Sequence, residues 1–127
     1  MNKFFICPKC GKLVLEFGNK RALTCDVCGE KMQRLVPNTV DAAVEKHKPF
    51  VTFNDNCVLV KVGEVAHPML ENHYIKAIFL QTTKGFYSLE LVPETEPVAR
   101  FNLKNEKPLN AYAYCNLHGL WQTEIKE

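Results

Sequence analysis

The chain has 127 residues, which is the size of one or two small domains, and its formal net charge is +2. This charge is too small to indicate binding to nucleic acid or to a membrane surface. The sequence has no apolar run of about 18 residues and no secretory signal, because the apolar run in the N-terminal MNKFFICPKC is too short, so we expect neither a membrane span nor export.

The cysteines of the first 36 residues indicate metal binding. We expect the protein in the cytoplasm, where cysteines stay reduced. Paired cysteines there indicate metal ligands rather than disulfides. Four of the six cysteines lie in CPKCG (7–11) and CDVCG (25–29). Between these motifs, KLVLEF (12–17) predicts a short strand and GNKRA (18–22) predicts a turn. Residues 1–36 are too few to bury a sufficient core, so this predicted first domain needs a metal ion to hold it together.

The two C-x-x-C-G motifs predict one closed site with four sulfur ligands. Each motif places two thiolates on a tight turn, and glycine permits the backbone geometry that follows the second cysteine. The site suits zinc, which would be structural, or a single iron, which could also carry an electron. Two disulfides are the alternative, which a reducing compartment disfavours. The predicted ligands are Cys7, Cys10, Cys25 and Cys28.

Residues 37–127 predict a second domain that is mostly β. TVDAAVEKH (39–47) predicts one or two helical turns, which Pro49 ends. Short segments rich in Val, Tyr and Phe follow, and turn-forming residues separate them. We expect a β-sandwich of about seven strands. The expected strands are PFVTF (49–53), CVLVKV (57–62), HYIKAIFLQ (73–81), FYSLELV (86–92), VARFNL (98–103) and LNAYAY (109–114).

The histidines of the second domain lie in distinctive settings. His67 and His73 flank PMLEN, and His118 follows Cys115 by three residues. These positions fall at the ends of predicted strands, where the loops of a sandwich gather. If all four histidines, including His47, met Cys115 at one metal, five ligands would exclude ordinary tetrahedral zinc. Four imidazoles in a plane, with a thiolate below and one open position, would suit a redox-active iron.

Three motifs of the second domain resemble those of one family. NTVDAAVEKHKP (38–49), VGEVAHPMLENHYI (62–75) and YCNLHGLW (114–121) are similar to the superoxide reductases of the desulfoferrodoxin, or neelaredoxin, family. The cysteine motifs and CGEKM (28–32) resemble the small desulforedoxin-like domain of that family. The resemblance implies an immunoglobulin-like β-sandwich with an iron centre after a four-cysteine domain. The spacing in CDVC departs from the adjacent cysteines of desulforedoxins and is similar to that of rubredoxins and zinc ribbons, so the second metal is iron or zinc.

The resemblance also implies a role for each site residue. His47, His67, His73 and His118 would be equatorial ligands of a mononuclear non-heme iron, and Cys115 its axial thiolate. Glu45 would bind the ferric centre as sixth ligand, and Lys46 would attract the substrate anion. Lys48, which is nearby in the sequence, would add positive charge. Without the family motif, we would interpret Glu45, Lys46 and Lys48 as part of a solvated charged surface. Backbone N–H groups around Asn116–His118 would tune the thiolate, and Trp121 would either shield it or belong to the core.

The implied activity is the one-electron reduction of superoxide to hydrogen peroxide without release of dioxygen. It would detoxify superoxide in anaerobic or microaerophilic cells. The implied partners are superoxide, a rubredoxin-like electron donor and a second copy of the chain in a homodimer. A zinc-ribbon binding module fused to an inert sandwich and a pure electron-transfer protein with two iron sites are the alternatives. Cys57 has no ligand-like neighbour in the sequence, and we interpret it as a core or edge residue.

Overall fold

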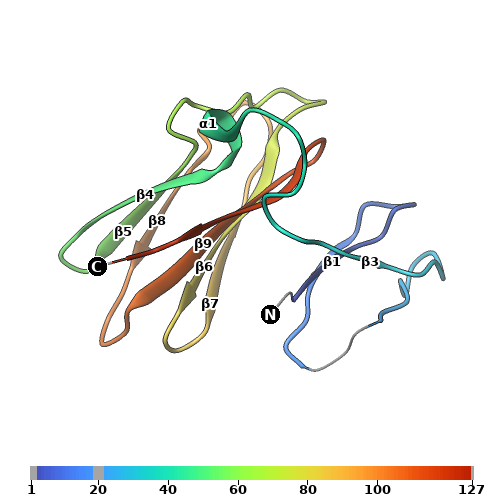
Figure 1. The fold of residues 1–127 in the computed structure, drawn as a ribbon, viewed down its shortest axis with the longest axis horizontal. Coiled ribbons are helices and arrows are strands. Elements are labelled where there is room, and N and C mark those ends of the chain that lie inside the picture. Colours follow the sequence, from blue (N-terminus) through green and yellow to red (C-terminus); the bar gives the residue numbers. More distant parts are fainter. Residues whose placement is uncertain (1–2, 19–21, 127) are drawn as a thin grey trace. The chain divides into compact units, whose positions relative to one another are not determined.

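The computed structural model describes residues 3–18 and 22–126, and the chain divides into two compact units, Met1–Val36 and Pro37–Glu127 (Figure 1). Most of the predicted turn at 18–22 lies outside the described residues. No helix of the described part is long and apolar enough to cross a membrane.

The first unit is a small antiparallel sheet with a core built partly of cysteines. Its strands are β1 (Phe4–Ile6), β2 (Leu13–Leu15) and β3 (Gln33–Arg34), in the order β2-β1-β3. The predicted strand at 12–17 is therefore present but shorter, and β1 was not foreseen. The buried cluster consists of Phe5, Cys7, Cys25 and Met32. Since half of this cluster is cysteine, apolar burial alone gives the unit little stability.

The second unit is a sandwich of two antiparallel sheets, so the predicted mostly-β fold is confirmed. One sheet has the strand order β10-β9-β6-β7 and the other has the order β4-β5-β8. A single helical turn, α1 (Val44–His47), precedes the first strand of the sandwich. The strands are β4 (Pro49–Asn54), β5 (Cys57–Val62), β6 (Ile75–Thr82), β7 (Phe86–Glu90), β8 (Val98–Asn102), β9 (Pro108–Cys115) and β10 (Gly119–Glu124).

The core of the sandwich lies between the two sheets and follows the alternation expected of strands. In β5 the buried residues are Val58, Val60 and Val62, while their neighbours are less buried. These valines belong to one cluster with side chains of β6, β8 and β9. The cluster extends along β9 to Cys115, which is fully buried. The packed core therefore reaches the end of the strand that carries the candidate thiolate.

The connections at one end of the sandwich carry the candidate site residues. Figure 1 shows α1 at this end, together with the connection from β5 to β6. The turn from β9 to β10, residues 116–118, is also there, because Cys115 pairs with both Gly119 and Ile75. The sequence did not single out β10 as a strand, although the expected number of strands was about seven. Its pairing with β9 keeps Cys115 and His118 on one tight turn.

Candidate metal centres

Three separate segments bring four histidines and one cysteine together. His47 is the last residue of α1, His67 and His73 lie in the connection from β5 to β6, and Cys115 ends β9. His118 lies in the following turn. The ligand atoms of His47, His67, His73 and Cys115 all lie within 4.8 Å of one another, which is a spacing that could hold a metal ion.

The four imidazole rings lie at the corners of a square. Around it, the centroids of neighbouring rings are 4.6 Å apart for His47 and His67, 4.7 Å for His67 and His73, and 5.2 Å for His73 and His118. The last side, from His118 to His47, measures 4.8 Å, and the diagonal from His47 to His73 is longer at 6.3 Å. Each ring is nearly perpendicular to its neighbours, with interplanar angles of 76° to 89°.

The sulfur of Cys115 lies close to two opposite corners of this square. Its Sγ is 3.4 Å from Nε2 of His67 and 3.9 Å from Nδ1 of His118. These two histidines occupy opposite corners, so the sulfur is not displaced beyond one side of the square. The arrangement places one soft donor beside four imidazoles.

The local backbone selects which nitrogen of each ring faces the centre. Nδ1 of His47 donates to the carbonyl of Ala43 at 2.7 Å, and Nδ1 of His67 donates to the carbonyl of Pro68 at 2.6 Å. Both rings therefore turn Nε2 toward the centre, as outer hydrogen bonds do for metal-binding histidines. His118 differs, because its Nδ1 faces Nε2 of His47 at 3.0 Å.

The donor atoms fit a metal ion. Two nitrogens that bind one ion at about 2.1 Å and at right angles lie about 3.0 Å apart, as Nε2 of His47 and Nδ1 of His118 do. Nε2 of His73 is buried and has no hydrogen-bond partner among the described residues. A buried polar nitrogen without a partner is costly, and a metal ion at the centre would satisfy it.

Burial prepares the ring nitrogens for a cation. It lowers the pKa of His67 to about 4 and also lowers the pKa values of His47 and His73, so these imidazoles are neutral at neutral pH. Burial raises the pKa of the Cys115 thiol, while backbone N–H groups of Leu117 and His118 lower it. Metal binding requires neutral imidazoles, which these histidines provide. The buried thiol of Cys115 needs a nearby cation to ionise, and a metal ion would supply it.

Trp121 supports two of the candidate ligands. Its ring stacks on that of His47, with centroids 5.1 Å apart and an interplanar angle of 27°. Its indole Nε1–H donates to the carbonyl of His118 at 3.0 Å. The side chain is only 2% exposed. Trp121 is therefore a core residue whose polar and apolar contacts both position the site.

Asn116 joins the turn after β9 to the segment that carries His73. Its side-chain Oδ1 accepts from the backbone N–H of Tyr74 at 2.9 Å, and its Nδ2 donates to the carbonyl of Asn72 at 3.0 Å. Its backbone N–H donates to the carbonyl of Tyr74 at 3.2 Å. The expectation that this N–H serves the thiolate is therefore wrong for Asn116, and sequence reasoning missed the role of its side chain. The sequence signal for this role was the side-chain amide of Asn116, two residues before the candidate ligand His118.

Glu45 and Lys46 are exposed on α1 beside the histidine cluster. Burial is the main cause of the lowered pKa of His47 and His73, but the charge of Glu45 raises that of His47, and the charge of Lys46 lowers that of His73. Both charges therefore lie within electrostatic range of the site. Glu45 is not in the group whose ligand atoms lie within 4.8 Å of one another. Lys48 is also exposed.

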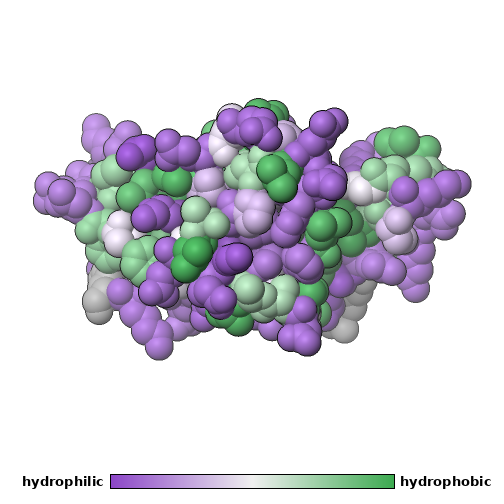
Figure 2. Space-filling model, turned by 90° about the horizontal axis from the view of Figure 1, so that it is seen from above, coloured by the Kyte–Doolittle hydropathy of each residue, from purple (hydrophilic) through white to green (hydrophobic). Residues whose placement is uncertain are grey.

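Exposed apolar side chains accompany the ligands on these connections. Val44, Val65, Leu70 and Leu117 are all at least half exposed, and each lies within three residues of a candidate histidine. Figure 2, which looks from above in the orientation of Figure 1, shows small apolar patches separated by hydrophilic side chains. The surroundings of the site are therefore mixed in polarity.

The four cysteines of the first unit form a second candidate centre on two matching turns. In each turn the first cysteine donates its N–H to the carbonyl five residues later, from Cys7 to Lys12 and from Cys25 to Glu30. Gly11 and Gly29 close the turns by donating back to those cysteines, and they have φ values of 80° and 73°. Such positive φ values favour glycine, as the motif predicted.

The sulfur spacing fits a tetrahedral ion. Sγ of Cys10 and Sγ of Cys25 are 3.7 Å apart, and two thiolates bound to one ion at about 2.3 Å in a tetrahedron lie about 3.8 Å apart. The backbone N–H of Cys10 lowers the pKa of Cys7 to about 7, whereas the side chain of Cys10 raises the pKa of Cys28 to about 12. Four clustered sulfurs ionise together only beside a cation. All four side chains are free thiols, so no disulfide forms among them.

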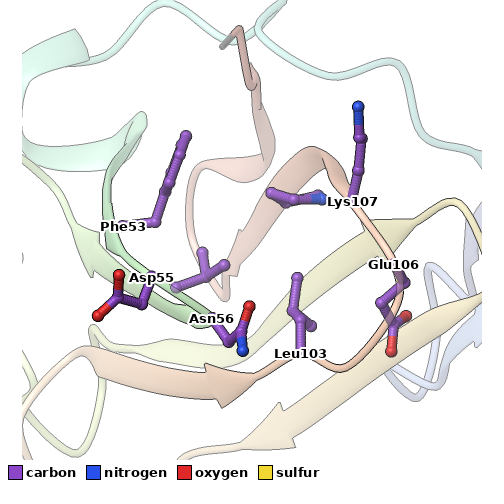
Figure 3. Close-up of a pocket in the computed structure, with 8 residues that line it drawn as sticks. Phe53, Asp55, Asn56, Leu103, Glu106 and Lys107 are labelled. Atoms are coloured by element: carbon purple, nitrogen blue, oxygen red, sulfur yellow. The ribbon is translucent and has the colours of Figure 1, made fainter.

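Two other features lie away from both centres. Cys57 is half-buried at the start of β5. A cavity of about 190 Å³ opens nearby, at the end of β5 away from His67, between the β4–β5 turn and the β8–β9 connection (Figure 3). Phe53, Asn56 and Leu103 line it. None of the predicted site residues lines this cavity.

The chain is similar to proteins of one family in both sequence and structure. Residues 39–124 match the family profile described as desulfoferrodoxin. The chain belongs to the desulfoferrodoxin family. A desulfoferrodoxin of Syntrophotalea carbinolica is 44% identical over 119 residues, which cover 93% of this chain and 92% of the relative. A superoxide reductase of Pyrococcus furiosus is 34% identical, over 64% of this chain and 87% of the relative.

A solved structure extends the similarity across both units. The superoxide reductase from Treponema pallidum superposes with a TM-score of 0.83 at 37% identity, and the match covers 98% of this chain and 99% of that one. Membership of the desulfoferrodoxin family, together with the two donor sets, implies metal binding.

Proposed function

We propose that this chain is a superoxide reductase. The reaction joins one superoxide anion, one electron and two protons to give one hydrogen peroxide, and no second superoxide is oxidised to dioxygen. The observation that carries the proposal is the square of four imidazoles with the Cys115 sulfur close to it. These donors would hold an iron ion that supplies one-electron redox chemistry. Relatives named superoxide reductase, from Pyrococcus furiosus and Treponema pallidum, support this activity.

The donor set suits iron that cycles between two oxidation states. When bound by His47, His67, His73, His118 and Cys115, ferrous iron supplies the electron that superoxide requires. The thiolate of Cys115 would donate electron density to a bound iron, which favours reduction of a ligand on that iron. The N–H groups of Leu117 and His118 limit this donation, because they stabilise charge on the sulfur.

Two charged residues of α1 would act on the substrate side. The ammonium of Lys46 attracts the superoxide anion and orders the water that delivers protons, and Lys48 adds positive charge. The carboxylate of Glu45 would serve as a further ligand of the ferric ion.

The reaction also needs an electron from outside the chain. We infer that a rubredoxin-like carrier supplies it in the cytoplasm, and that iron or zinc occupies the four-cysteine site. With iron, this site could relay electrons. We further infer a homodimer, following the family resemblance. In an anaerobic or microaerophilic cell the activity would remove superoxide without producing dioxygen.

Metal analysis and a visible spectrum of the oxidised protein test the proposal. We expect iron and a thiolate-to-ferric absorption band that disappears in Cys115→Ser. With an added reductant, pulsed superoxide should give one peroxide per superoxide and no dioxygen. A colourless protein with two zinc ions would contradict the proposal, and so would release of dioxygen.

Lys46→Ala provides a variant with the ligands intact. It should keep iron and the absorption band, yet react about three- to tenfold more slowly with superoxide at low ionic strength, because one steering charge is lost. Its rate should also depend less on salt than the rate of the unmodified protein. An unchanged rate would remove Lys46 from the mechanism without removing the activity.

A further inference from the structure

Asn38 binds the outer edge of β10 as a residue of a neighbouring strand would. Its backbone N–H donates to the carbonyl of Leu120 at 3.0 Å. Its side-chain Nδ2 donates to the carbonyl of Gln122 at 3.1 Å, and its Oδ1 accepts from the N–H of Gln122 at 2.9 Å. Among the described strands, β10 lies at the edge of its sheet and pairs with β9 on one side only. Asn38 therefore fastens the chain to the other side of β10.

The backbone and the side chain at position 38 both call for asparagine. Asn38 has a φ of 63°, a left-handed conformation that glycine and asparagine adopt more readily than other residues. Glycine would fit this backbone but has no side chain to bind Gln122. An ionised aspartate could accept the N–H of Gln122 but could not donate to its carbonyl. Asparagine meets both requirements.

The segment from Asn38 to Pro49 is attached to β10 on both sides of α1. At its far end, the hydroxyl of Thr123 donates to the carbonyl of Pro49 at 2.6 Å. Near its start, Val40 packs against the first residue of β10, because a Cβ added at Gly119 would lie 3.3 Å from Cγ2 of Val40. The helical turn α1 lies between these attachments, so β10 holds the ends of the segment that carries it.

The part of β10 that binds Asn38 also contacts His47. Leu120 and Gln122 flank Trp121, whose ring stacks on that of His47 with centroids 5.1 Å apart. The hydrogen bonds of Asn38 and this stack therefore act on neighbouring residues of one strand. Because the chain between Asn38 and His47 is held at both ends, it has fewer conformations to lose when His47 joins a metal.

We propose that Asn38 is a positioning residue of the histidine metal site. It is not a ligand, and it acts through His47 by fixing the start of the segment that carries this ring. His118 directly precedes β10, so the attachment helps to keep Nε2 of His47 3.0 Å from Nδ1 of His118. The role rests on the metal binding that the proposed function requires, and not on the reaction itself.

Cobalt(II) binding to the full chain tests this role without superoxide. Cobalt bound by His47 should quench the fluorescence of Trp121, because the two rings stack. Competition with nitrilotriacetate then gives the affinity of the histidine site. Asn38→Gly keeps the backbone conformation and removes both side-chain hydrogen bonds, so it should weaken cobalt binding about fivefold. Asn38→Asp keeps the bond from the N–H of Gln122 and should give an intermediate affinity.

Two control variants separate positioning from stability. Asn105→Gly makes the same change at another asparagine of positive φ, 57°, in the β8–β9 connection. Asn110→Ala removes two side-chain hydrogen bonds elsewhere in the sandwich. Both variants should keep the cobalt affinity of the unmodified protein, although Asn110→Ala should lower the melting temperature. All of these changes leave the four cysteines intact, so any quenching from that site is common to them.

The cobalt affinity decides the proposal. If Asn38→Gly lowers the melting temperature but binds cobalt as tightly as the two controls, Asn38 only stabilises the fold and the positioning role is overturned. That result would leave the proposed function intact. If Asn38→Gly does not fold, Asn38→Asp decides, because an affinity below that of both controls supports the role and an equal affinity overturns it.

Discussion

At the scale of single residues, the histidine site depends on hydrogen bonds as much as on the ligands. The carbonyls of Ala43 and Pro68 orient His47 and His67, and Trp121 stacks on His47. Asn116 ties the turn of His118 to the segment of His73 through both ends of its amide. Outer contacts of this kind set the distances between ligands before a metal arrives.

Asn116→Ala should weaken metal binding at the histidine site. Removing two hydrogen bonds should cost about 1–2 kcal/mol of stability, and the freer His73 should lower metal affinity about tenfold. Thermal unfolding and competition with a chelator measure these effects separately.

Asn110→Ala is the matched control for this change. Asn110 also makes two side-chain hydrogen bonds, to Gln81 and Gln122, but it lies five residues from Cys115 along β9. It should lower the melting temperature by a similar amount and leave metal affinity unchanged. Equal affinities for the two variants would show that Asn116 only stabilises the fold.

At the scale of elements, the short helix α1 is placed by a close contact with the end of β5. A Cβ atom added at Gly63 would lie 2.8 Å from the carbonyl oxygens of Glu45 and Lys48. Such a distance is shorter than atoms tolerate, so only glycine lets the backbone of α1 approach here. The N–H of Val65 then donates to the carbonyl of Glu45 at 2.9 Å and completes the contact.

Gly63→Ala should displace α1 and with it His47. We expect a loss of stability of about 1–3 kcal/mol, because the added methyl group meets backbone atoms that cannot move independently. The ligand field of bound metal should change, which a visible or EPR spectrum would reveal.

Gly85→Ala serves as the comparison, since a Cβ there meets nothing within 4 Å. Gly85 lies in the β6–β7 turn and has a positive φ, so its replacement tests backbone strain without crowding. It should destabilise the fold without a change in the spectrum. An unaltered spectrum in Gly63→Ala would mean that the contact does not position His47.

At the scale of the whole molecule, the two units have cores of different kinds. The sandwich buries a cluster of side chains from four strands, whereas the cluster in the first unit is Phe5, Met32 and two cysteines. Metal binding contributes about 10–16 kcal/mol in structural zinc sites of small domains, far more than so small an apolar cluster. The first unit should therefore depend on its metal for folding.

Removing the metal from both sites should unfold the first unit and leave the sandwich folded. The chain has one tryptophan, Trp121, and it is buried in the sandwich, so its fluorescence reports that unit alone. Limited proteolysis of the metal-free protein should cleave within residues 3–18 and 22–36, while the emission maximum of Trp121 stays at the short wavelength of a buried indole. Protection of this segment without metal would contradict the prediction.

The strand pattern of the second unit and the glycine turns of the first could be predicted from the sequence, because alternation and C-x-x-C-G motifs act locally. β1 and β10 were not predicted. FFI is short and lies next to the first cysteine motif, and GLWQTE is short and begins within the motif that contains Cys115 and His118. The site residues were proposed by family resemblance, and their catalytic roles stay predictions. The contacts that Asn116 and Gly63 make could not be predicted, because the partners of both residues are distant in the chain.

The sequence by itself determined the donor types, their grouping into motifs and the mostly-β class, since each depends on neighbouring residues. Only the tertiary structure decided the order of the four rings around the square and the use of Nδ1 by His118. His47 and His118 are 71 residues apart in the chain. They meet because the packing of two sheets fixes where α1 and the β9–β10 turn lie, and no local pattern carries that information.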